Sequence, residues 1–191
     1  MAKVVVKSKV KKVKRKFPVE IVAPEFLNSK KIGSTEVTDL NSLVGKTTKL
    51  SMMYITGSVK NQNVRLTFKV VEVNSGLAKT QLSIYQHVPY YLGRNIRVNS
   101  DLIEDSFVVK SKDGLNVRVK PFIISKQSAS GLVKSVIRNE TKKIIGNELA
   151  SKTYDQFMNE VIGGKVQIGF KNSLKTILPL KTFEFKKISL E

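Results

Sequence analysis

The sequence has no cysteine and no tryptophan, and its single histidine is His87. Without cysteine the chain can form neither a disulfide nor a thiolate metal site, and it has no thiol nucleophile. Because there is only one histidine, any histidine-ligated metal site or catalytic triad would have to use His87. We interpret His87 as a surface or capping residue, and the scattered carboxylates lack the spacing typical of acid–base catalysis. The sequence therefore predicts no enzyme, no cofactor, no metal and no small-molecule substrate.

Acidic residues are also scarce. The chain of 191 residues carries 15 Asp and Glu against 34 Lys and Arg, a net charge of +19. Such an excess favours a polyanionic partner, and nucleic acid is the commonest soluble polyanion. No apolar run approaches the roughly 18 residues that a membrane-spanning helix needs, and the start is unlike a secretory signal. We therefore expect a cytoplasmic protein with no membrane partner.

The positive charge is densest in the N-terminal stretch MAKVVVKSKVKKVKRKF. Because this stretch has no apolar period, we expect residues 1–16 to form a disordered basic extension before a single RNA-binding domain at 17–191. Lysine suits phosphates better than base edges, so the extension should position the protein rather than select a sequence. A solubilising tail or a localisation signal is the alternative. The eight cations of the extension account for 8 of the net charge of +19, and neither alternative explains the +11 that remains on the rest of the chain. The predicted phosphate contacts of the extension are Lys3, Lys7, Lys9, Lys11, Lys12, Lys14, Arg15 and Lys16.

Residues 19–73 read mostly as extended structure. In VEIVAP the alternation places Val19, Ile21 and Ala23 on one face. In NVRLTFKVVEVNSG apolar residues alternate with Arg65, Thr67 and Lys69, and the alternation changes phase at Val70-Val71. We interpret the phase change as a β-bulge, because one extra residue turns every later side chain to the opposite face.

The stretch FVVKSKDGLNVRVKPF predicts a hairpin. A two-residue turn at Asp113-Gly114 would place lysines on the apolar face of the hairpin. A three-residue loop over 112–114, with Gly114 in the left-handed conformation, keeps that face apolar. Its pairs would be Phe107 with Val119, Val109 with Val117, and Ser111 with Leu115. Leu115, Val117 and Val119 should then face the core. The opposite face carries Lys110, Arg118 and Lys120, which are either RNA contacts or solvated cations.

The second half of the chain has helical periodicity. An amphipathic helix follows Ser130, with the apolar stripe Leu132, Val133, Val136, Ile137, Ile144, Ile145 and Leu149. TYDQFMNEVIGG has a capping box at Thr153 and Gln156 and a stop at Gly163. Spacing favours a third helix from Val166 towards Pro179 over a strand. A short helix is expected from Pro89 through YYLGRNI. With the closing strand LKTFEFKKISL, the order of elements predicts an α+β fold built on a mostly antiparallel, barrel-like sheet.

VGKTTK resembles the end of a phosphate-binding P-loop. The first glycine of that motif would fall at position 40, which is Leu40, so the match fails. We expect instead a turn between two strands that bends at Gly45. Lys46 in this turn is a further candidate RNA contact.

Several stretches, in order, resemble one family, the archaeal and eukaryotic small-subunit ribosomal protein eS1, or S3Ae. They are VEIVAPEF, KIGSTEV, VEVNSGLAKT, VKSKDGLNVRVKPF, KTYDQFMNEVIGGK and ILPLKTFEFKKI. The chain is similar to the shorter archaeal form. The resemblance implies a barrel-like domain with packed helices that binds ribosomal RNA on the platform side of the small subunit, near the mRNA exit and neighbouring ribosomal proteins, without catalysis. A non-specific, chromatin-like DNA-binding protein is the alternative.

Overall fold

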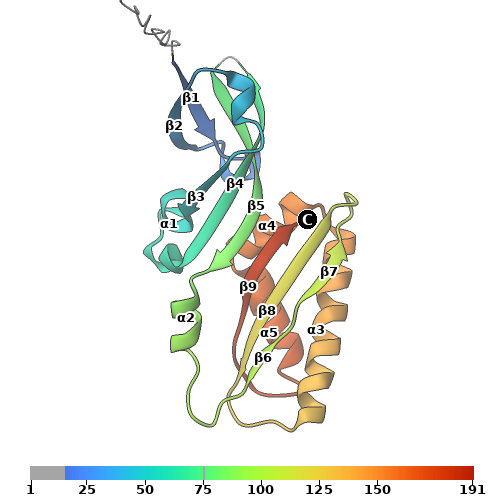
Figure 1. Ribbon diagram of the computed structural model, residues 1–191. Helices are drawn as coiled ribbons and strands as arrows, with labels where there is room; N and C mark the ends of the chain where they lie inside the picture. Colours follow the sequence, from blue (N-terminus) through green and yellow to red (C-terminus); the bar gives the residue numbers. More distant parts are fainter. Residues whose placement is uncertain (1–15, 75) are drawn as a thin grey trace, which may run out of the picture.

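One β-sheet runs through the protein, whose computed structural model describes residues 16–74 and 76–191 (Figure 1). The predicted contacts Lys3, Lys7, Lys9, Lys11, Lys12, Lys14 and Arg15 lie outside the described residues. The strands are β1 (Phe17–Val22), β2 (Lys31–Val37), β3 (Thr47–Ser51), β4 (Val64–Asn74), β5 (Leu77–His87), β6 (Leu102–Glu104), β7 (Phe107–Lys110), β8 (Asn116–Ser125) and β9 (Leu180–Leu190).

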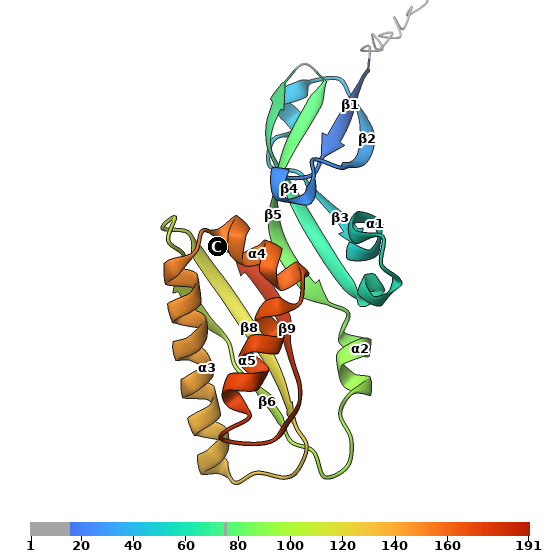
Figure 2. The same ribbon diagram turned by 180° about the vertical axis from the view of Figure 1, so that it is seen from behind.

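Helices are concentrated in the second half of the chain. Figure 1 shows α4 and α5 behind β8 and β9, and Figure 2 shows them in front of the same strands. The α-helices are α1 (Met52–Thr56), α2 (Pro89–Arg94), α3 (Gly131–Ser151), α4 (Tyr154–Ile162) and α5 (Lys165–Leu174). Short 3-10 helices are η1 (Glu25–Leu27), η2 (Leu40–Leu43) and η3 (Val59–Asn63). No helix among the described residues is long and apolar enough to cross a membrane.

The strand order is β2-β1-β5-β9-β8-β6, with β4 paired to β5, β3 to β4 and β7 to β8. The α+β fold is confirmed, and the pairs are antiparallel except for β1 with β5. The barrel-like closure that we expected is not seen, because β2 and β6 end the order and do not pair with each other. β5 joins two parts of this open sheet, pairing with β1 over residues 77–79 and with β9 over residues 84–86.

The main core lies between the sheet and the helical layer. Phe157, Phe170, Phe183 and Phe185 are buried there, with neighbouring rings edge to face at centroid distances of 5.6–6.3 Å. Such pairs add to the free energy gained by burying the rings. A second, smaller core around Val19 holds β1 and β2 against β4 and β5. The two cores give each part of the long sheet its own apolar support.

The predicted hairpin register is confirmed: Phe107 pairs with Val119 and Val109 with Val117, and Gly114 has φ +76°. Val117 and Val119 are fully buried, as expected. Leu115 is 36% exposed, so its predicted core position is wrong. It precedes the first residue of β8 and lies at the hairpin tip, where the loop leaves the packed sheet.

Most helix predictions hold. Thr153 and Gln156 form the capping box of α4, and α5 is a helix rather than a strand. The stripe on α3 is narrower than expected, because Leu132 is 82% exposed and Val136 is 48% exposed. The left-handed residue after α4 is Gly164 rather than Gly163. Helix α2 begins at Pro89, and β4 has the expected register shift between Val70 and Glu72.

Candidate nucleic-acid interface

One face of the sheet presents its side chains away from the main core. Directly paired residues of neighbouring strands project from the same face of a sheet. One continuous row of pairs consists of Lys49, Thr67, Ile84, Ser189, Arg118 and Val108. A second row consists of Ser51, Arg65, Gln86, Lys187 and Lys120. The alternate residues, including Leu66, Tyr85 and Ile188, belong to the main core.

We call this surface the open face and define it by its basic residues, which are Lys49, Arg65, Lys69, Lys110, Arg118, Lys120 and Lys187. They come from β3, β4, β7, β8 and β9, so segments more than a hundred residues apart in sequence contribute to it. Figure 1 looks onto the lower part of this face, over β7, β8 and β9. Pairing of the strands thus places the alternate basic side chains of separate segments on one face of the sheet.

Most of these cations have no carboxylate partner. Among the described residues, Arg118 is the member of the open face that forms an ion pair, with Nε 2.5 Å from Oε1 of Glu191. Next to Lys187 in β9, Nζ of Lys186 lies 2.9 Å from Oε1 of Glu104. Lys49, Arg65, Lys69 and Lys110 are exposed, whereas Lys120 and Lys187 are half-buried. Exposed cations without a local counter-charge are the groups that phosphates neutralise most readily.

The predicted face of Lys110, Arg118 and Lys120 is therefore real, since Lys110 lies opposite Asn116 and Arg118 opposite Val108. The structure adds that Arg118 is engaged with Glu191, so its charge is already partly balanced.

Lys46 and Lys16 lie apart from the two rows. Lys46 is exposed and precedes Thr47, which pairs with Lys69 at the edge of the open face. The predicted bend at Gly45 is confirmed by its φ of +85°, although the turn follows η2 rather than a strand. Lys16 is exposed just before β1, at the end of the molecule where the chain enters the sheet.

Comparison with known proteins addresses the identity of the chain. The sequence model of the ribosomal S3Ae family matches residues 5–191. The chain belongs to this family. Among its relatives are proteins named small ribosomal subunit protein eS1. The one from Archaeoglobus fulgidus is 29% identical over 172 residues, which cover 89% of this chain and 82% of the relative. The one from Nanoarchaeum equitans is 28% identical over 179 residues, covering 93% and 90%.

Membership of the S3Ae family confirms the resemblance drawn from the hairpin and the C-terminal helices. In the open face of this protein, two basic positions could have been found from the sequence, because Arg65 and Lys69 alternate with the apolar residues of β4. Lys49 and Lys187 could not, since their places depend on pairing with β4 and β8. Within the described residues no group of His, Asp and Glu side chains gathers as a metal site would require.

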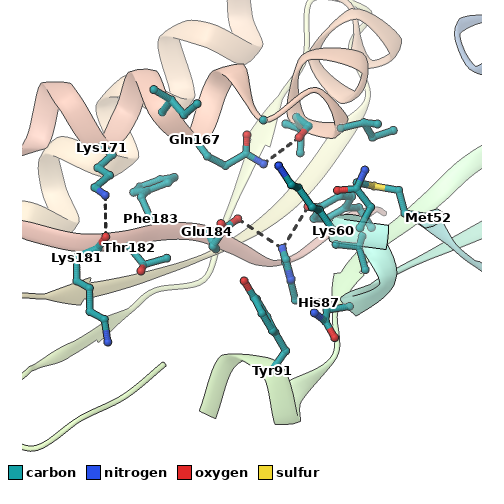
Figure 3. A pocket seen from close by; sticks show the side chains of 18 residues that line it. Met52, Lys60, His87, Tyr91, Gln167, Lys171, Lys181, Thr182, Phe183 and Glu184 are labelled. Atoms are coloured by element: carbon teal, nitrogen blue, oxygen red, sulfur yellow. Dashed lines mark hydrogen bonds and ion pairs between the residues drawn. The ribbon is translucent and has the colours of Figure 1, made fainter. Parts of the chain in front are cut away.

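Our interpretation of His87 as a surface or capping residue is wrong. His87 is 6% exposed, and its ring stacks on Tyr91 at 5.6 Å. Its Nε2 lies 3.3 Å from the hydroxyl oxygen of Tyr85 and 3.5 Å from Oε2 of Glu184. Burial, reinforced by the negative charge of Glu184, raises the pKa of Tyr85, so this hydroxyl stays protonated. These groups border a cavity of about 400 Å³ (Figure 3).

Proposed function

We propose that this protein is a structural component of the small ribosomal subunit and binds ribosomal RNA with the open face and the basic N-terminal extension. The S3Ae family membership supports the ribosomal role, and the names of the matched relatives support the small subunit. The observation that carries the RNA contact is the set of cations that the paired strands align on one face, most of them without a carboxylate partner among the described residues.

The chemistry of this interface is charge neutralisation by a rigid array. The backbones of paired strands lie about 4.8 Å apart, as at Lys120 and Lys187, and residues two apart on a strand, such as Arg118 and Lys120, are separated by about 7 Å, so the backbone positions of the basic residues are fixed. Each phosphate that meets a cation releases condensed counterions, which favours binding at low salt. Because double-stranded RNA hides its base edges, a protein of this kind reads its shape and backbone. The open face therefore suits a folded RNA surface.

By its family resemblance, we place the protein on the platform side of the subunit near the mRNA exit, in contact with neighbouring small-subunit proteins in the cytoplasmic ribosome. The basic extension, from Lys3 to Lys16, then reaches RNA beyond the sheet. Lys46 contributes at the edge of the open face. No catalytic step is part of this proposal.

Competition between structured RNA and duplex DNA tests the proposal. The full-length protein is bound to a labelled fragment of small-subunit ribosomal RNA, and unlabelled RNA or duplex DNA of equal charge is added. We expect RNA to displace the label at lower concentration, and the native protein to sediment with small subunits from a lysate. Equal displacement by DNA, together with migration away from ribosomal particles, would favour the chromatin-like alternative.

The extension has its own signature in the salt dependence of binding. If all eight of its cations meet phosphates, deleting residues 1–16 should reduce the slope of log affinity against log salt by about 6–7 at most. The thermal unfolding midpoint of the remaining protein should hardly change. Salt titrations and melting curves of both proteins measure the two effects. An unaltered slope would remove the extension from the interface.

A further inference from the structure

The cavity beside His87 forms where two strands of the sheet separate. β5 pairs with β9 over residues 84–86 and then continues through His87 into α2. Residues 182–184 of β9 pair with β8 on one side, and on the side of β5 they have no strand partner among the described residues. Side chains from η3, α2 and α5 line the space, which is partly open to solvent and measures about 400 Å³. This volume lies within the range of cavities that bind small organic groups.

Gln167 of α5 brings an unpaired hydrogen-bond acceptor to the cavity wall. The residue is 7% exposed, and its Nε2 donates to the carbonyl oxygen of Val161 at 2.9 Å. Because a carbonyl can only accept, this bond fixes which end of the amide is oxygen. The Oε1 atom has no donor among the described residues. A buried acceptor without a donor is costly, so the site calls for a partner that carries N–H groups.

Glu184 supplies a second acceptor in the same wall. Its Oε2 faces His87, whereas Oε1 makes no hydrogen bond with a described residue, and the side chain is 26% exposed. Figure 3 shows Glu184, Gln167 and His87 converging on the cavity from β9, α5 and β5. Glu184 therefore presents an oxygen acceptor to anything that enters, and Oε1 of Gln167 lies buried within the same wall.

The rim of the cavity is cationic, and one wall is aromatic. Lys60 of η3 is exposed, forms no ion pair with a described residue, and reaches over the cavity (Figure 3). Nζ of Lys171 donates to the carbonyl oxygen of Lys181 at 2.7 Å. Tyr91, stacked on His87, adds a flat ring. A ligand that satisfies all these groups has a negative charge, a planar ring and N–H donors.

We propose that this cavity receives one unpaired nucleotide of the bound RNA, with a base that carries an exocyclic amino group. The amino group donates to Glu184, and a turn of the Gln167 side chain brings its buried Oε1 to the same amino group, while the phosphate meets Lys60. Single-stranded nucleotides are recognised in this manner, by stacking and by hydrogen bonds to the base edge. The inference rests on the proposed RNA binding and adds a pocket beside β5 to the open face.

His87 provides the measurement, because it is the single histidine in the sequence and its imidazole gives one set of NMR signals. The full-length protein is titrated with AMP, CMP, UMP and inorganic phosphate. We expect AMP and CMP to shift the His87 signals with saturation, and UMP to bind roughly tenfold more weakly for want of the amino donor. Inorganic phosphate alone should leave the signals in place.

Variants assign the effect to the cavity. Gln167→Leu removes the buried acceptor and should abolish the preference for AMP and CMP over UMP. Lys60→Gln removes an exposed charge, so the fold should be intact, and it should weaken all the nucleotides. Lys175→Gln, an exposed lysine after α5 that does not line the cavity, is the matched control and should change neither.

The decisive titration uses the ribosomal RNA fragment. RNA that binds and shifts the His87 signals in the wild type, but less in Gln167→Leu, supports the pocket. RNA that binds with an ordinary salt slope and leaves His87 unmoved overturns the pocket while the proposed function stands. Signals that respond to free nucleotides but not to bound RNA also overturn it, in favour of a mononucleotide site. Absence of any RNA binding defeats the proposed function itself.

Discussion

The same strands build two surfaces of opposite character. On β4, Leu66 and Phe68 are fully buried in the main core, whereas Arg65 and Lys69 are exposed on the open face. On β8, Val117 and Val119 face the helices, and Lys120 faces away from them. Because successive side chains of a strand project to opposite faces, one face of each strand contributes to stability and the other to the proposed binding surface. Substitutions on the two faces should accordingly change different measured properties.

The largest loss of stability is expected on the covered face. Phe185 is fully buried and meets the rings of Phe157, Phe170 and Phe183. Phe185→Ala should lower the free energy of unfolding by about 3–5 kcal/mol, because it leaves a cavity in the core. Denaturant unfolding measures this. Val108→Ala on the open face is the control and should stay within about 0.5 kcal/mol. Equal losses at both positions would erase the distinction between the faces.

A smaller loss of stability is expected at the tip of the hairpin, whose loop sets the register of β7 with β8. Gly114 has φ +76°, in the region that β-branched residues avoid. Gly114→Val should cost about 1–3 kcal/mol through backbone strain, since no neighbour would clash with an added Cβ. The comparison variant is Gly169→Ala within α5, where the backbone is ordinary and a gain of about 0.5–1 kcal/mol is expected. Unchanged thermal stability of Gly114→Val would contradict the strained loop.

These features were predictable because their causes are local. The hairpin register follows from which pairing keeps one face apolar, and the α4 cap follows from Thr153 and Gln156. The bulge in β4 follows from one change of phase. Each needs about a dozen residues of sequence and no knowledge of distant segments.

Other features depend on contacts between distant segments, which explains why they were missed. His87 is buried because β5 separates from β9 and because α2 covers it. Glu184, almost a hundred residues further along the chain, also covers it. Leu132 shows apolar periodicity but lies on the solvent side of α3. Lys187 joins the open face because β9 pairs between β5 and β8. Local alternation gives each strand two faces but does not say what covers them.

The junction between sheet and helices should respond to acid. Asp101, just before β6, accepts hydrogen bonds from the backbone N–H of Ala129 at 2.6 Å and from Ser128 at 3.2 Å. Its carboxylate also lies 3.1 Å from Nζ of Lys134. The Ala129 N–H, followed by Lys134, lowers the pKa of Asp101 below 3.8. These contacts hold the segment that leads from β8 into α3.

Because the folded-state pKa is depressed, this contribution to stability is fully present above pH 3.8 and is lost as the pH falls through the folded value. Asp101→Ala should therefore lower the melting temperature at neutral pH, and the difference from wild type should shrink as the pH falls below 3.8. Melting curves across this pH range measure it. Glu140→Ala, which removes an exposed pair with Lys143, should have almost no effect at any pH. A constant difference for Asp101→Ala would assign its role to packing.

The smallest change in stability, and the clearest change in binding, is expected from charges on the open face. The triple variant Lys49→Gln, Arg65→Gln and Lys69→Gln removes exposed cations that have no carboxylate partner among the described residues. Its unfolding free energy should remain within about 0.5 kcal/mol of wild type at each site. If all three meet phosphates, the slope of log affinity against log salt should fall by about 2–3.

A second triple variant separates location from net charge. Lys142→Gln, Lys165→Gln and Lys175→Gln remove the same number of charges from exposed positions in α3 and α5 and just after α5, in the helical layer. General electrostatic attraction to RNA would weaken equally in both variants, because their net charges are identical. Direct phosphate contact on the open face predicts that the first triple reduces the salt slope and that the second leaves it nearly unchanged. Equal slopes for the two would mean that the sheet organises the charges without using them as a docking surface.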